Sequence, residues 1–163
     1  MCENTEFKTF KLKKACKDCP FRKDKSYLSP ESIRDRINDV IKHDRSFICH
    51  KTILYTDYQP LQQEVDDYIE ELKHDGVSDE GLKLARLELE KEYNLSELKQ
   101  EYEASLKDQM YCAGMLILVK KENMLGNNRA LRYAIGKKLF NPDQFIDEHE
   151  VYDSIEDAIK GHS

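Results

Sequence analysis

Two cysteines placed two residues apart are the clearest chemical signal in this chain. Cys16 and Cys19 flank two residues, and Pro20 follows the second cysteine. A Cys-x-x-Cys turn places two sulfur atoms on one side of a tight loop, where both can hold one metal ion or cluster. Two more cysteines, Cys49 and Cys112, lie far downstream. We expect the fold to bring all four to one centre.

The chemistry of sulfur limits which metal ion or cluster these cysteines can bind. Thiolates are soft ligands that select zinc or iron–sulfur clusters over hard cations. Structural zinc sites usually contain two close pairs of ligands, and this chain has one such pair. Scattered ligands and a proline after a cysteine are both familiar for iron–sulfur clusters, so a 4Fe–4S cluster is the first expectation and Zn²⁺ the second. The remaining alternative is a set of unrelated buried cysteines, since free cysteine is common in protein cores.

Three further residues, His50, Arg22 and Cys2, could take part in the centre or lie outside it. His50 directly follows Cys49, and neighbouring side chains on an extended segment point in opposite directions. We therefore expect His50 to contact the ligands without binding the metal itself. Arg22 either contacts the ligands too and offsets the negative charge of the thiolates, or is an ordinary surface arginine. Cys2, near the start of the sequence, is expected to take no part.

The composition indicates long water-exposed helices. Of 163 residues, 36% are charged and 39% are apolar, against about a quarter and nearly half in average domains. No run approaches the length needed to span a bilayer, and the lysine-rich start of the chain does not resemble a signal peptide. We therefore expect a cytosolic location without a membrane partner. Disulfides are rare there, so clustered cysteines bind metal or do redox work.

Charge alternates along the chain. Residues 1–51 carry 13 basic and 8 acidic residues, and residues 109–140 carry 6 and 1, a net charge of +5 in each case. Residues 52–108 carry 6 basic and 16 acidic residues, a net charge of −10, and residues 141–163 carry 1 and 7, a net charge of −6. These parts either pair with each other and with water, or the basic cysteine-bearing parts meet nucleic acid or an acidic protein.

Most elements that must position the cysteines are predicted to be helical. Apolar and polar residues alternate over 7–12, which predicts a short strand, and 46–52 is expected to be extended. Helices are predicted from helix-start signals and apolar spacing in four places: after Ser29 with an end near His43, over the apolar run 110–119, after Asn127 or Asn128, and after Ser154.

The acidic segment 57–108 differs from the rest of the chain. Two apolar stripes at helical spacing flank a turn at Asp75–Ser78, and a break is expected near Asn94. They predict an αα-hairpin inserted between the third and fourth cysteines. The expected fold class is mainly α. It is a single small helical domain over 1–163, built around a four-cysteine metal centre, with a short strand element and this inserted hairpin.

Three motifs in order carry a likeness to a known family. Cys16–Arg22, Phe47–His50 and Cys112–Gly114 match the patterns C-x-x-C-P-[aromatic]-R, F-x-C-H and C-A-G. The chain outside the acidic segment, including Val151–Ser154, resembles an uncharacterised family of small cysteine-rich proteins from bacteriophages and some actinobacteria. The resemblance implies a cysteine-held metal or cluster in a phage-encoded protein of the host cytoplasm. The Cys-Pro-x-Arg element alone is similar to WhiB-like iron–sulfur regulators, whose remaining spacing is absent here.

The sequence favours binding over catalysis. It contains no glycine-rich phosphate loop, no Gly-x-Ser-x-Gly and no His-Glu-x-x-His. We expect a non-enzymatic binding module, an accessory or regulatory protein that engages a host protein. One alternative is a nucleic-acid-binding regulator that uses the basic cysteine-bearing face, and another is a redox or nuclease enzyme centred on a cluster or on His50. The oligomeric state stays open.

Overall fold

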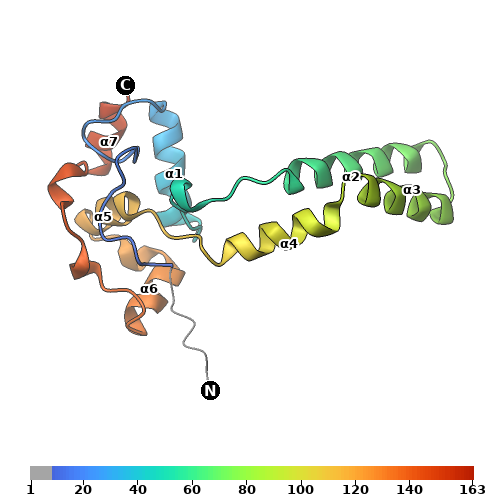
Figure 1. Ribbon diagram of the computed structural model, residues 1–163. Helices are drawn as coiled ribbons and strands as arrows, with labels where there is room; N and C mark the ends of the chain where they lie inside the picture. The colour runs from blue at the N-terminus through green and yellow to red at the C-terminus, as the bar shows by residue number, and fades with distance from the viewer. Residues whose placement is uncertain (1–8) are drawn as a thin grey trace, which may run out of the picture. The chain divides into compact units, whose positions relative to one another are not determined.

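The computed structural model describes residues 9–163, and most of this range is helical (Figure 1). The α-helices found there are α1 (Pro30–Lys42), α2 (Tyr58–His74), α3 (Asp79–Glu92), α4 (Leu95–Leu106), α5 (Ala113–Lys121), α6 (Arg129–Gly136) and α7 (Ile155–Gly161). Short 3-10 turns are η1 (His50–Thr52), η2 (Leu125–Asn127), η3 (Pro142–Gln144) and η4 (Glu148–Glu150). The prediction of a mainly α fold is confirmed. Within the described range, no helix combines the length and the apolar character needed to cross a membrane.

Extended pairing in the described part of the chain is limited to isolated bridges. The strand expected at 7–12 begins outside the described residues, and residues 9–12 form a turn followed by irregular backbone. The ring of Phe10 is buried and stacks on Tyr111 and Phe140, with centroid distances of 4.9 and 4.8 Å. Phe10 in this segment therefore packs in a stack of aromatic rings and not in a sheet.

Contacts divide the chain into two compact units. The first, here called the cysteine unit, comprises the chain up to Thr52 together with Gln109–Ser163. The second, here called the hairpin unit, comprises Ile53–Asp108 and separates the third cysteine from the fourth in the sequence. Each unit has a hydrophobic core of its own.

Helices α1 and α5 supply much of the core of the cysteine unit. Ser29 caps α1 by accepting a hydrogen bond from the Ser32 N–H at 3.1 Å, and the helix ends close to the predicted position. Its buried stripe is Ile33, Ile37 and Val40. The run predicted to be helical at 110–119 becomes helix at Ala113, and every side chain from there to Val119 is buried. A helix that is apolar on all sides belongs at the centre of a core.

Asn128 ties the start of α6 to the end of α1. Its Oδ1 accepts a hydrogen bond from the Leu131 N–H at 3.1 Å. Its Nδ2 donates to the carbonyls of Val40 at 2.9 Å and Arg45 at 3.1 Å. The side chain is fully buried, and both of its polar atoms have partners. Of the two asparagines predicted to cap this helix, Asn128 is the one that does so.

We expect Asn128→Ala to destabilise the cysteine unit by about 3 kcal/mol, since the change removes a cap and the donor to two carbonyls. Urea unfolding followed by circular dichroism measures the loss. Asn141→Ala is the matched control, because Asn141 caps the short turn η3 from an exposed position. Its expected cost is below about 1 kcal/mol. Equal losses in the two variants would contradict the role assigned to Asn128.

The hairpin unit contains three helices, because its second arm is broken at the predicted place. Gly76 adopts a φ of +82° in the turn after α2, and the Ser78 Oγ accepts a hydrogen bond from the Gly81 N–H at 3.3 Å to begin α3. Asn94 has a left-handed backbone with φ 52° and separates α3 from α4. The buried core of this unit is Val65, Ile69 and Leu95.

Candidate metal centre

The loop that carries the first two cysteines is a tight turn. The Cys19 N–H donates to the Cys16 carbonyl at 3.1 Å, and the Arg22 N–H donates to the Cys19 carbonyl at 3.2 Å. Cys19 is fully buried and Cys16 is half-buried. The two thiols are close enough to shift each other's pKa, that of Cys16 downward and that of Cys19 upward.

Backbone pairing aligns the segments that carry the other two cysteines. The Cys49 N–H donates to the Met110 carbonyl at 2.8 Å, and the Cys112 N–H donates to the Phe47 carbonyl at 2.9 Å. An isolated antiparallel bridge lies between these two hydrogen bonds. Cys49 and Cys112 are both buried, and Cys112 stands immediately before α5. Two cysteines remote in sequence are thus held side by side.

The structure brings all four cysteines of the predicted ligand set together. The Cys19 and Cys112 Sγ atoms lie 3.5 Å apart, although 93 residues separate them in sequence. The Cys16 and Cys49 Sγ atoms lie within 4.8 Å of each other. The four donors therefore come from three separate segments of the chain. Cys2, expected to take no part, lies outside the described residues.

The pKa values of the four thiols are shifted in different directions. The hydrogen bond from Cys19 lowers the pKa of Cys16 to about 5, and a hydrogen bond from the same thiol lowers the pKa of Cys112. The bonds to Cys112 and Cys16, together with burial, raise the pKa of Cys19. Burial raises the pKa of Cys49 to about 11. A bound cation would favour the thiolate form of all four cysteines.

His50 lies closer to the cysteines than the sequence predicts. The segment after Cys49 is not extended, because the Cys49 carbonyl accepts hydrogen bonds from the N–H and Oγ1 of Thr52, each at 2.8 Å. His50 therefore begins the turn η1. The ligand atoms of His50, Cys49 and Cys16 all lie within 4.8 Å of one another. His50 and Cys49 therefore do not point in opposite directions as they would on an extended segment, and the exposed His50 is a fifth candidate donor.

Arg22 contacts carboxylates. Its Nε lies 2.9 Å from the Asp24 Oδ1, and its Nη1 is paired with the Glu150 carboxylate at 2.5 Å. Its backbone forms an isolated bridge with Val151. Among the described residues, Arg22 thus connects the end of the cysteine loop to the segment around η4.

His162 holds the loop of the first cysteine pair from the far end of the chain. Its ring is buried, and its Nε2 donates to the Pro20 carbonyl at 2.8 Å, since a carbonyl can only accept. Its Nδ1 then accepts a hydrogen bond from the Leu28 N–H at 3.3 Å. Because Pro20 directly follows Cys19, His162 fixes the backbone beside a candidate ligand. Nothing in the spacing of His162 indicates this role.

A second set of contacts joins the loop to the segment after Cys49. The Tyr27 hydroxyl donates to the Asp18 carbonyl at 2.6 Å. The Lys51 ammonium lies 2.8 Å from the Asp18 carboxylate and lowers the pKa of Asp18 through a hydrogen bond. Asp18 lies between the first two cysteines, and Lys51 follows His50, so this ion pair links two of the three donor segments.

Gly114 allows α5 to approach the first cysteine pair. A Cβ atom at Gly114 would overlap the Cys19 Sγ and would lie 3.4 Å from the Ala15 Cβ. Because Gly114 has no Cβ, the backbone of α5 can come close to Cys19. Any larger residue here would force the Cys19 sulfur or α5 to move.

Comparisons with protein-family models, with curated proteins and with solved structures find no match. Four sulfur donors and one imidazole fit a soft or borderline cation such as Zn²⁺, or an iron–sulfur cluster, better than Mg²⁺ or Ca²⁺.

Proposed function

We propose that Cys16, Cys19, Cys49 and Cys112 bind one Zn²⁺ ion, and that this structural centre stabilises a non-enzymatic binding module. The observation that carries the proposal is the convergence of four thiols from three segments, with the Cys19 and Cys112 Sγ atoms 3.5 Å apart. In a tetrahedral zinc site with Zn–S bonds of about 2.3 Å, neighbouring sulfurs lie about 3.8 Å apart. This spacing needs only a small outward movement of the two sulfurs.

We favour zinc over the 4Fe–4S cluster that the sequence places first because one pair of sulfurs, those of Cys19 and Cys112, lies as close as two ligands of a single ion. A cluster attaches each thiolate to a different iron, and the inorganic core lies between them. Four thiolates around a cluster therefore stand farther apart than four thiolates around a single ion. Four protein ligands would complete either centre and leave no open position for a substrate.

We propose further that the module engages a host protein in the cytoplasm, in line with the resemblance to phage-encoded proteins. The hairpin unit supports this role because it has its own core and a net charge of −10. Such a unit is suited to contact a basic protein surface. Recognition of nucleic acid by the basic segments is the competing role. It requires an affinity that falls steeply with salt concentration.

Metal analysis of protein purified without oxygen tests the centre. We expect one zinc per chain and a colourless solution. A brown protein that contains iron and sulfide would establish a cluster in place of zinc. A metal-free protein whose cysteine unit stays folded in the presence of a chelator would overturn the structural role of the centre.

An enzyme is the second candidate, and the position of His50 is the observation that favours it. A centre held by Cys16, Cys49 and His50 would have three protein ligands, and such sites keep a fourth position for water or substrate. His50 is exposed, so solvent would reach that position.

His50→Ala separates the two candidates. For a structural centre of four thiolates we expect the zinc affinity to fall about tenfold, as for other residues that contact ligands, while the fold persists. Competition with a chromophoric chelator measures the affinity, and circular dichroism reports the fold. A folded, fully metallated His50→Ala protein that has lost a measurable redox or nuclease activity would establish the enzyme instead.

A further inference from the structure

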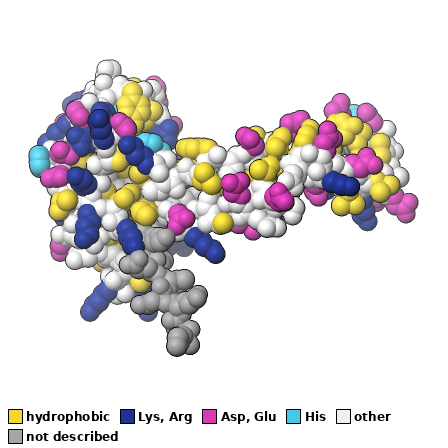
Figure 2. Space-filling model, viewed as in Figure 1, with side chains coloured by type: hydrophobic (Ala, Val, Ile, Leu, Met, Phe, Trp, Pro, Cys, Tyr) yellow, Lys and Arg dark blue, Asp and Glu magenta, His cyan; other side chains and the backbone are white. Residues whose placement is uncertain are grey.

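The hairpin unit carries a large share of the exposed apolar surface. Eleven large apolar side chains are exposed in residues 9–163, and seven belong to this unit: Leu54, Tyr55, Tyr68, Val77, Leu84, Leu87 and Leu106. Figure 2 shows apolar and acidic side chains interleaved over its helices. Exposed apolar side chains that cluster within a charged surface mark interaction sites.

A groove between α2 and α3 combines both features. It has a volume of about 200 Å³ and is lined by Glu64, Val65, Tyr68, Leu89 and Tyr93. Tyr68 is 46% exposed, and the Tyr93 hydroxyl donates a hydrogen bond to the Glu64 carboxylate at 3.1 Å. Pockets for small molecules usually exceed about 300 Å³, so this groove is suited to a single side chain.

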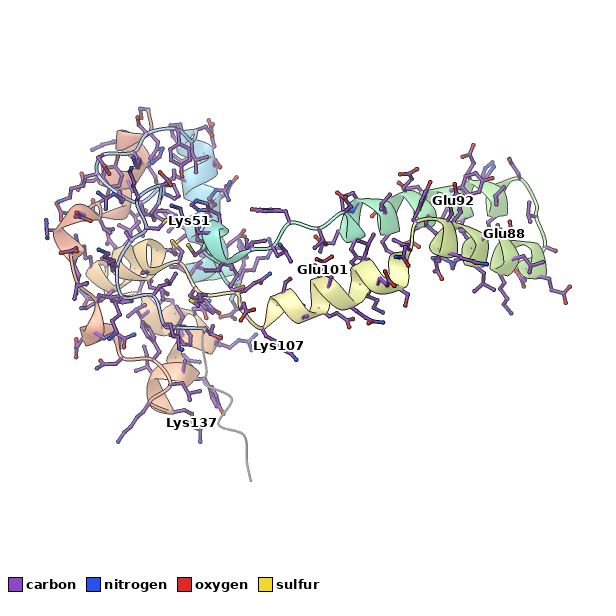
Figure 3. All side chains as sticks on the ribbon, viewed as in Figure 1. Lys51, Glu88, Glu92, Glu101, Lys107 and Lys137 are labelled. Atoms are coloured by element: carbon purple, nitrogen blue, oxygen red, sulfur yellow. The ribbon has the colours of Figure 1, made fainter. Side chains whose placement is uncertain are left out.

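The lining of the groove favours a positively charged side chain over a neutral or negative one. All five lining residues are apolar, aromatic or acidic. Glu64 is the charged residue of the lining. Two further carboxylates, Glu88 and Glu92, lie one helical turn apart on α3, outside the lining (Figure 3). An ammonium or guanidinium group is attracted by the faces of tyrosine rings and by carboxylates together. Two tyrosines beside Glu64 provide both.

We propose that this groove binds a lysine or arginine side chain of a basic partner protein. The inference rests on the proposed function as a binding module and identifies the class of partner. A second copy of the hairpin, a nucleic acid or an anionic membrane would each bring negative charge against a unit of net charge −10. A basic helix supplies the cation for the groove and apolar contacts for its rim.

The full-length metallated protein tests the proposal with a defined probe. The probe is a labelled synthetic helix of about 15 residues, with lysine on one face and leucine on the other. Fluorescence anisotropy measures its affinity. We expect Tyr68→Ala and Glu64→Gln each to weaken binding about three- to tenfold, because each removes one attraction for the cation.

Two matched variants control for general charge and for exposed rings. Glu101→Gln removes an exposed carboxylate on α4, and Tyr133→Ala removes an exposed ring in the cysteine unit. Both are expected to change the affinity less than about twofold. Equal losses for Glu64→Gln and Glu101→Gln, or a wild-type protein that does not bind the probe, would overturn the groove as a binding site. The zinc content of the same samples tests the metal centre independently of the groove.

Discussion

Replacement of any one of Cys16, Cys19, Cys49 and Cys112 by serine is expected to abolish stoichiometric zinc binding and to unfold the cysteine unit. A site assembled from three segments does not exist in the unfolded chain, so its binding free energy contributes directly to folding. Structural zinc contributes about 10–16 kcal/mol in small domains, which equals or exceeds the net stability of about 5–15 kcal/mol of a typical domain. A missing thiolate therefore removes more free energy than the fold has in reserve.

Metal analysis and circular dichroism of each variant measure this effect. Cys2→Ser is the control and should keep both the metal and the fold, as the sequence predicts for a residue outside the centre. Zinc titration of the chelator-treated wild-type chain should restore the signal of the folded unit with one equivalent. Full metal content in Cys112→Ser would show that the fourth ligand is assigned wrongly.

Replacement of the segment from Tyr58 to Lys107 by about eight Gly/Ser residues is expected to keep one zinc per chain and to abolish binding of the basic probe. The Thr52 Oγ1 accepts a hydrogen bond from the Met110 N–H at 2.9 Å. The two ends of the cysteine unit are thus joined where the hairpin is inserted. Loop length changes the entropy of closure only slowly, so a shorter connection is tolerated.

Zinc content and probe affinity of the shortened chain are the two measurements. A matched control keeps the hairpin and adds the same linker to the turn at Gly76, where nothing lies within 4 Å of an added Cβ. That control should retain both properties. Loss of zinc from the shortened chain alone would place the hairpin in the core of the centre.

Local signals explain why most helices could be predicted from the sequence. The cap residues Ser29, Asn128 and Ser154 each accept a hydrogen bond from a backbone N–H three residues later. Such contacts lie within one helical turn, so a short window of sequence contains all the information that they require. The break at Asn94 is similar, because asparagine tolerates the left-handed backbone found there.

Contacts between distant residues explain what the sequence could not predict. The loop of the first cysteine pair is fixed by His162, whose partner Pro20 lies 142 residues away. The proximity of His50 to Cys16 depends on how η1 is placed against the loop, which no local pattern encodes. At residues 9–12 apolar and polar residues do alternate. However, Phe10 packs in a stack of rings from distant segments and not against a neighbouring strand.

The insertion of the hairpin also bears on the order of events during folding. Cys49 and Cys112 meet only after the long intervening chain has closed, and closing a long unfolded loop has an entropic cost. In the hairpin unit, the rings of Tyr58 and Tyr102 lie 5.6 Å apart, and the Gln59 Nε2 donates to the Tyr102 hydroxyl at 2.9 Å. Helical contacts within a short segment form faster than pairings between distant segments. We therefore expect the hairpin to form first. Once folded, it shortens the flexible loop between Cys49 and Cys112, so the two parts of the cysteine unit pair faster.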